Sequence, residues 1–188
     1  TRYDSRFNIV ARMYQNIFEA TYRTLDYYQG NLINAFKELQ DNGQVELITC
    51  AATHGFLPLI GLQREVVRAQ VEVAVNNHRR LFGKSPAGLW LPECAYNPGD
   101  DAILKDYGLK YFVVDAHGLL YASPRPRYSI FAPVYTPSGV AAFGRDLESS
   151  EQVWSAQEGY PGDFDYREFY RDIGYDLDYD YIKHYIHP

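Results

Sequence analysis

The sequence predicts an α/β fold, with a parallel sheet or barrel built from βαβ units. Short apolar segments alternate with amphipathic helical segments, in the order strand 44–49, helix 63–82, strand 87–91, helix 98–107 and strand 110–115. Helical crossovers of this length join parallel strands and cover the faces of their sheet. With 188 residues the chain can bury one core, so a single domain over 1–188 is expected.

Two helices are expected before the first strand. Residues 6–28 carry apolar side chains at helical spacing, and Gly30 ends that helix. A second helix begins at Asn31, and Gly43 lies at its C′ position, where a left-handed residue is favoured. The run 44–49 (Gln-Val-Glu-Leu-Ile-Thr) then predicts a short buried strand.

The helix expected at 63–82 has the clearest pattern. Val67, Val71 and Val75 lie on one stripe with Gln70 and His78, and we expect His78 to be structural. Further along the chain, Pro98 suits the first turn of the next helix. Residues 140–143 predict a fourth strand, and residues 146–188 are acidic and aromatic.

Polar side chains follow the predicted strands at their carboxyl ends. His54 follows the first strand, Glu93 the second, and Asp115 and His117 end the third. Active sites of α/β barrels and open α/β sheets form at that edge. We therefore expect these side chains to converge at one edge of the sheet or one end of the barrel.

Glu93 is a carboxylate in an aromatic setting. It follows Trp90-Leu91-Pro92 and precedes Cys94-Ala95-Tyr96. Flat aromatic faces can stack on a sugar ring, and an apolar wall can tune the acidity of a carboxyl group. The segment suits sugar chemistry, although a solvated rim glutamate would have the same pattern.

Glycoside cleavage normally uses two carboxylates. Asp115 is available as a partner for Glu93, or as a structural acid that orients His117 or caps a turn. His54 and His117 could each donate a hydrogen bond to a sugar hydroxyl or orient a carboxylate. Each could instead form a hydrogen bond with the backbone of its own loop. Cys94 could act as a nucleophile with either histidine, although a buried inert thiol is commoner.

No metal site is expected. Asp176, Asp178 and Asp180 alternate as in a calcium loop, but Tyr181 replaces the required glycine and His187 the final glutamate. Cys50 and Cys94 form no CxxC pair and no disulfide framework, which favours a reducing, cytoplasmic location.

Charge and composition exclude several partners. The net charge of −6 argues against nucleic acid and against anionic membrane surfaces. No apolar run is long enough to span a bilayer. Aromatic content of 16%, mostly tyrosine, supplies the flat amphipathic surface that carbohydrate clefts use.

Three segments in order resemble glycoside hydrolase family 57, especially its 1,4-α-glucan branching enzymes and their amylase relatives. They are Gln44–Thr49 after Gly43, the run Ala52-Thr53-His54-Gly55-Phe56-Leu57-Pro58-Leu59, and Trp90–Tyr96. Residues 114–118 and 153–163 are similar to the same branch. The resemblance covers most of the chain from about residue 30.

The resemblance implies an incomplete (β/α)7 TIM-like barrel with parallel strands and helical crossovers. It implies that Glu93 is the nucleophile of a retaining mechanism on α-glucan (glycogen, starch or amylose), with no cofactor. His54 and Trp90 would line the donor site. Trp154 and Tyr160 would lie near the glucan path.

The family's acid/base aspartate lies near a Phe-Gly-His run, which the 188 residues do not contain. Its opening histidine motif and the following helical domain are likewise expected outside the chain, so a partial catalytic domain without turnover is expected. An α-amylase-like hydrolase and a non-catalytic glucan-binding protein are the alternatives. A sugar deacetylase would need a metal-binding Asp/His set that we cannot assemble here.

Overall fold

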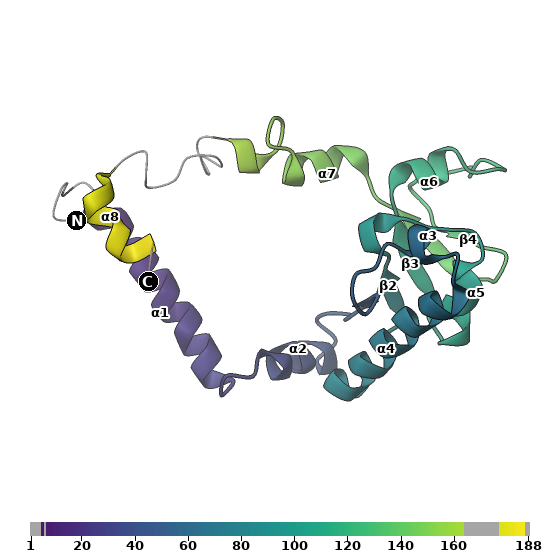
Figure 1. The fold of residues 1–188 in the computed structure, drawn as a ribbon, viewed down its shortest axis with the longest axis horizontal. Coiled ribbons are helices and arrows are strands. Elements are labelled where there is room, and N and C mark those ends of the chain that lie inside the picture. Colours follow the sequence, from purple (N-terminus) through teal and green to yellow (C-terminus); the bar gives the residue numbers. More distant parts are fainter. Residues whose placement is uncertain (1–4, 6, 164–176, 187–188) are drawn as a thin grey trace. The chain divides into compact units, whose positions relative to one another are not determined.

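The computed structural model describes residue 5, residues 7–163 and residues 177–186 (Figure 1). Its helices are α1 (Phe7–Tyr27), α2 (Leu32–Asp41), α3 (Leu57–Ile60), α4 (Arg64–Phe82), α5 (Asp100–Asp106), α6 (Ala116–Leu120), α7 (Leu147–Trp154) and α8 (Tyr179–Ile186). Its strands are β1 (Thr49–Cys50), β2 (Gly88–Trp90), β3 (Tyr111–Val114), β4 (Val134–Tyr135) and β5 (Ala141–Gly144). Two short 3-10 turns are η1 (Pro92–Cys94) and η2 (Tyr160–Gly162).

The strands form one sheet in the order β1-β2-β3-β5-β4. β1 and β2 are parallel, with Thr49 opposite Leu89 and Cys50 opposite Trp90. Helix α4 connects these two strands, so the predicted βαβ unit is confirmed. Closure of the sheet into a barrel remains a prediction.

The chain divides into two compact units. The first comprises residues 1–112 with 135–141, and the second comprises 113–134 with 142–188.

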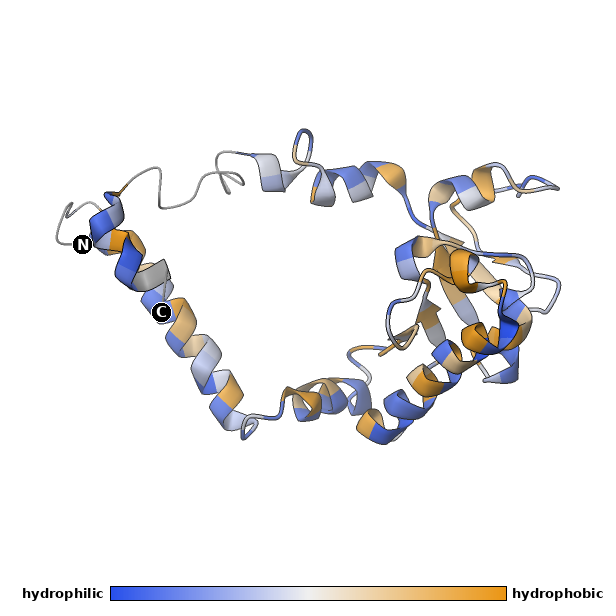
Figure 2. Ribbon diagram, in the orientation of Figure 1, coloured by the Kyte–Doolittle hydropathy of each residue, from blue (hydrophilic) through white to orange (hydrophobic). Residues whose placement is uncertain are grey.

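Helix α4 supplies much of the core of the first unit. Val67, Val71 and Val75 are fully buried along one stripe of α4, and β2 and β3 contribute the buried Leu89 and Phe112. Figure 2 shows this amphipathic pattern as apolar patches that alternate with polar ones along the helix. The helix predicted at 63–82 is therefore confirmed within one residue.

His78 is the buried polar residue of the α4 stripe, with 4% of its surface exposed. Burial lowers the pKa of His78, because the apolar surroundings disfavour the charged ring. Its structural role, expected from the sequence, is confirmed. Gly83 ends the helix in the left-handed conformation, with φ of 73°.

The first predicted strand was too long. Only Thr49–Cys50 form a ladder with β2, and residues 45–48 have no regular structure. In the observed register, Glu46 would lie opposite Pro86, which has no amide hydrogen to donate. The proline thus bars pairing at residue 46, and residues 47–48 also remain outside the ladder.

The helix predicted from Pro98 begins two residues later, at Asp100. Gly99 precedes it with φ of 96°, a left-handed conformation from which the helix cannot extend backwards. The short elements α3, α6, α7 and β4 were not predicted, since they contain too few residues for a periodic pattern.

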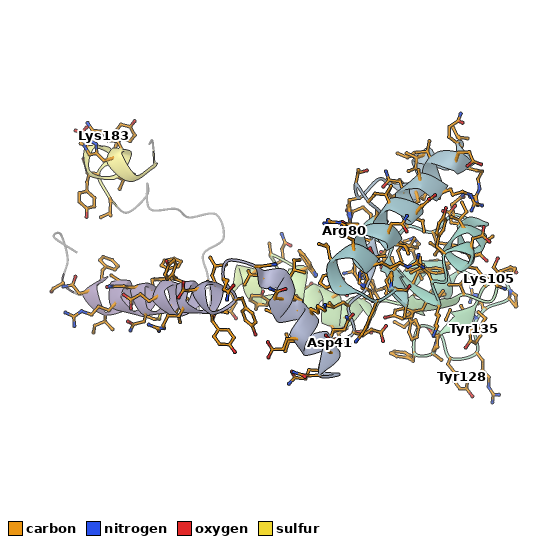
Figure 3. All side chains as sticks on the ribbon, turned by 90° about the horizontal axis from the view of Figure 1, so that it is seen from below. Asp41, Arg80, Lys105, Tyr128, Tyr135 and Lys183 are labelled. Carbon is orange, nitrogen blue, oxygen red and sulfur yellow. The ribbon has the colours of Figure 1, made fainter. Side chains whose placement is uncertain are left out.

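The two helices before β1 are confirmed. Neither α1 nor α2 has a buried residue. Asn31 is the N-cap of α2, and its side chain accepts a hydrogen bond from the amide of Ile33. Asp41 lies at the other end of α2 (Figure 3). Its Oδ1 lies 2.7 Å from Nζ of Lys84. This ion pair links the end of α2 to the residues that follow α4.

In the second unit, β5 confirms the strand predicted at 140–143. Gly144 packs closely, because a Cβ atom there would lie 3.0 to 3.1 Å from side-chain atoms of Leu119 and Ile130. Asp146 caps α7 by accepting from the amide of Ser149. None of the helices in the described ranges has the length and apolar character needed to cross a membrane.

Candidate active site around His54 and Glu93

The parallel pairing of β1 and β2 brings His54 and Glu93 together. Each residue lies three or four positions beyond its strand, and the carboxyl ends of neighbouring parallel strands share one edge. His54 Nε2 lies 3.3 Å from Glu93 Oε1. The two side chains are 53% and 74% exposed, so an incoming molecule can reach both of them. The expected convergence is confirmed for this pair.

Both residues have left-handed backbone conformations. His54 has φ of 55°, Glu93 has φ of 54°, and Cys94 follows with φ of 53°. Such values are uncommon for residues with a Cβ atom and cost about 1–3 kcal/mol each. Strain of this kind concentrates at functional sites, where it fixes the direction of a side chain.

A third side chain completes the cluster from β1. Cys50 Sγ lies 3.2 Å from His54 Nδ1, on the opposite side of the ring from Glu93. Burial raises the pKa of the Cys50 thiol, although the amide of Ala51 partly opposes this. The sequence raised Cys94 as a nucleophile beside a histidine but favoured a buried thiol, and Cys94 is indeed buried, with 4% of its surface exposed within η1.

Gln70 of α4 fixes the loop that carries His54. Its Oε1 accepts from the amide of Thr53 at 2.9 Å, and its Nε2 donates to Thr53 Oγ1 at 2.8 Å. The carbonyl of Gln70 also accepts from the amide of Ala52 at 3.1 Å. The available sequence signal was a polar residue on the otherwise apolar stripe of α4.

Asp101 fixes the segment that follows Glu93. Its Oδ1 accepts from Tyr96 Oη at 3.0 Å and from the amide of Gly99 at 3.1 Å, and its Oδ2 accepts from the amide of Ser138 at 3.1 Å. Burial opposes ionisation of Asp101, but the hydrogen bonds, including one from Thr136, outweigh it and lower its pKa to about 2.

Tyr96 is part of this support. Its ring stacks on Phe112 with centroids 5.1 Å apart, so one of its faces is covered. Burial, reinforced by the hydrogen bond to Asp101, raises the pKa of Tyr96 to about 12. One ring face of Tyr96 is therefore taken by Phe112, and a stacking role of Tyr96 toward a sugar stays a prediction.

Trp90 lies at the carboxyl end of β2. Its neighbours Leu89 and Leu91 are fully buried, whereas Trp90 is 36% exposed. Since side chains alternate along a strand and paired residues share a face, Trp90 lies on the same face as Cys50. An exposed indole thus stands beside the Cys50–His54–Glu93 cluster.

In the second unit, Asp115 has both of the structural roles considered from the sequence. Its Oδ1 accepts from the amide of Ala116 at 2.8 Å, which caps α6, and its Oδ2 lies 3.5 Å from His117 Nδ1. The carboxylate is thus engaged as a helix cap and as a partner of His117.

The aromatic residues expected near a glucan also belong to the second unit. Trp154 is 77% exposed and lines a shallow hollow of about 290 Å³ with Asp115, Arg145 and Glu151. Tyr160 is 54% exposed at the start of η2. Both rings are therefore accessible to solvent.

Within the described ranges, no group of three or more His, Cys, Asp or Glu side chains could hold a metal ion. Asp176 and His187, which belong to the calcium-like pattern, lie outside those ranges.

Comparison with known proteins gives a consistent set of relatives. The α-amylase AmyC of Thermotoga maritima is 50% identical in sequence; its crystal structure matches 95% of this chain and 34% of its own, with a TM-score of 0.86. The family 57-type branching enzyme of Pyrococcus horikoshii is 38% identical, matches 89% of this chain and 33% of its own, and has a TM-score of 0.80.

A curated 1,4-α-glucan branching enzyme of Thermococcus kodakarensis is 38% identical over 182 residues, which span 83% of this chain and 27% of that protein. Its crystal structure, in complex with glucose, matches 84% of this chain with a TM-score of 0.74. The chain thus spans about a quarter of the length of this curated relative.

The family model for glycosyl hydrolase family 57 matches residues 5–186, a range that contains both strands of the site and both of its central side chains. With this match and these relatives, the chain belongs to glycosyl hydrolase family 57.

Proposed function

We propose that this chain contributes the nucleophile side of a retaining active site on α-1,4-glucan. The observation that carries the proposal is the exposed carboxylate of Glu93, held in a left-handed turn and 3.3 Å from His54. In a double displacement, Glu93 attacks the anomeric carbon while the glycosidic oxygen leaves. The sugar is then held on the enzyme as an ester. In this proposal the sheet is part of an incomplete (β/α)7 barrel.

The neighbouring residues have roles consistent with this chemistry. His54 donates a hydrogen bond to Glu93 and orients the attacking oxygen, and Trp90 offers a ring face to the donor sugar. We assign His117, Trp154 and Tyr160 to sugar contacts further along the glucan. The exposure of both aromatic rings, and the hollow beside Trp154, support this assignment.

We further propose that the ester on Glu93 is passed to the 6-hydroxyl of another glucan chain, which would make the protein a branching enzyme. The 38% identity to two branching enzymes supports this choice. Hydrolysis is the second candidate, because the similarity to an α-amylase is higher, at 50% identity. The two reactions differ only in whether a sugar hydroxyl or water attacks the ester.

A fluorinated α-glucosyl fluoride tests the role of Glu93. Fluoride leaves as the C1–F bond breaks and needs little protonation, so the label can form without an acid catalyst. An ester bond forms between Glu93 and C1, and mass spectrometry locates the added sugar on the Glu93 peptide. Glu93→Gln should take up no label, whereas Glu65→Gln, on the first turn of α4, should react like the parent. A label on another residue, or equal labelling of Glu93→Gln, would contradict the proposal.

Amylose distinguishes transfer from hydrolysis. Branching creates new α-1,6 points, which debranching of the product releases as short chains and which iodine staining reports as a colour change. Hydrolysis instead raises the number of reducing ends without new branch points. A product with reducing ends alone would replace the branching assignment by the hydrolase.

A further inference from the structure

The ring of His54 lies between two partners of different character. Nε2 faces the carboxylate of Glu93 at 3.3 Å, and Nδ1 faces the thiol of Cys50 at 3.2 Å. An ionised carboxylate can only accept, so Nε2 must carry the proton for a hydrogen bond to form. In a neutral ring the lone pair then lies on Nδ1, where a thiol can donate to it. The three side chains form a line of donors from Cys50 to Glu93.

We propose that Cys50 is a positioning residue, which donates its S–H to Nδ1 of His54 and keeps the ring in the neutral tautomer that donates from Nε2 to Glu93. Cys50 acts through His54 and has no chemical step of its own. The inference depends on the proposed function only in taking Glu93 as the reacting carboxylate.

The tautomer matters for the chemistry of a carboxylate nucleophile. A neutral N–H donor orients the carboxylate oxygen and leaves its negative charge available for attack. An imidazolium would form an ion pair with the same oxygen and hold that charge more strongly. A protonated thiol favours the neutral ring, because it can donate to a lone pair on Nδ1 but offers the second N–H of an imidazolium only a weak sulfur acceptor.

The surroundings of His54 favour the thiol form over a thiolate–imidazolium pair. Burial raises the pKa of Cys50, so the thiol keeps its proton in the neutral range. Among the described residues, the titratable groups that hydrogen-bond to the ring are Cys50 and Glu93, and α4 presents the uncharged Gln70 to the same loop. No positive side chain in these contacts stabilises a thiolate.

The backbone holds the ring in place from both sides. Cys50 is in the β1 ladder, and its position relative to β2 is fixed by pairing with Trp90. The loop carrying His54 is bound through Thr53 to Gln70, and His54 itself is left-handed. The contact between Cys50 and His54 therefore joins two fixed backbone segments.

Nitrogen-15 NMR of histidine-labelled protein reads the tautomer directly, since the two ring nitrogens have distinct shifts in each form. In the parent at neutral pH, we expect His54 to be neutral with its proton on Nε2. A ring that is mainly protonated on Nδ1, or an imidazolium at pH 7, would overturn the proposal without any variant. This measurement also decides the case if a Cys50 variant does not fold.

Cys50→Ala removes the donor, and Cys50→Ser replaces it with a hydroxyl that can still donate. Loss of one hydrogen bond predicts a shift of about two- to tenfold in the tautomer ratio toward the Nδ1–H form. Cys50→Ser should restore most of the parent ratio. His117, whose Nδ1 faces Asp115, is an internal control that should not change in either variant.

The role of Cys50 would be refuted if the tautomer ratio of His54 in Cys50→Ala stayed within twofold of the parent ratio while the His117 signals were unchanged. The outcome is separable from the test of the proposed function. If the fluoride reagent does not label Glu93 but the His54 tautomer responds to Cys50 as expected, the hydrogen-bond relay stands and the assignment of Glu93 as nucleophile fails.

Discussion

Replacing Asp101 with asparagine should destabilise the first unit in a pH-dependent way. The folded-state pKa of Asp101 is about 2, against 3.8 for an ordinary aspartate. This difference corresponds to about 2 kcal/mol of folding free energy at neutral pH. Asp101 is only 2% exposed, so solvent screening removes little of this amount. The Asp101→Asn variant also turns an amide NH2 toward one of the donors on Tyr96, Gly99 or Ser138.

The sign of the pH effect follows from the depressed pKa. The carboxylate of Asp101 stabilises the fold above the unfolded-state pKa, and this contribution is lost as the pH falls through the folded-state value. About half of it should remain at pH 3, and about a sixth at pH 2. The difference between parent and Asp101→Asn should therefore shrink by about 1 kcal/mol between pH 7 and pH 3.

Urea unfolding followed by the fluorescence of Trp90 measures this difference. The chain has two tryptophans, so a Trp154→Phe background leaves Trp90, in the first unit, as the single reporter. Asp106→Asn is the matched control, because Asp106 is 55% exposed in its pair with Arg68 and should change stability by less than about 1 kcal/mol. An Asp101→Asn penalty that is the same at pH 7 and pH 3 would refute the assignment of the stabilisation to the ionised carboxylate.

Two further substitutions test the packing around the site. Gln70→Leu removes both side-chain hydrogen bonds to Thr53 and should destabilise the first unit by about 1–3 kcal/mol, with faster amide exchange at residue 53. Gln70→Glu can still accept from that amide and should lose less stability. Equal exchange rates in the parent and both variants would contradict this role of Gln70. Gly88→Ala directs a methyl group into the ring of Tyr111 and should destabilise by about 1–3 kcal/mol in urea unfolding. The double variant with Tyr111→Ala should show a smaller penalty for the methyl group than Gly88→Ala alone, and strictly additive penalties would show that the ring is not the obstacle.

Local sequence patterns predicted the elements that position the site. The stripe of α4, with Gly83 after it, was sufficient for that helix, because its period and its stop signal agree. The pairing of His54 with Glu93 followed from the topology: two parallel strands joined by a helix must end at the same edge. The sequence therefore identified His54 and Glu93 as neighbours, but it could not supply the distance between them.

The contacts that refine the site could not be predicted in this way. The approach of Cys50 to Nδ1 depends on the left-handed conformation of His54, which turns the ring back toward its own strand. No residue pattern marks that conformation, since the usual signal, a glycine, stands one position later, at Gly55. The short length of β1, which pairs only at Thr49–Cys50, is likewise not marked by the apolar run 44–49.

The left-handed turn at Glu93 and Cys94 limits how this protein can be altered by laboratory evolution. Glycine at position 94 would relieve about 1 kcal/mol or more of backbone strain, but it would also remove a core side chain that is 4% exposed, so the two effects on stability oppose each other. The same change would make the backbone next to Glu93 more flexible, and the orientation of the Glu93 carboxylate would be less well defined. Valine, isoleucine and threonine are disfavoured there by their branched Cβ atoms. Variants that keep activity while gaining stability should therefore carry their changes away from this turn.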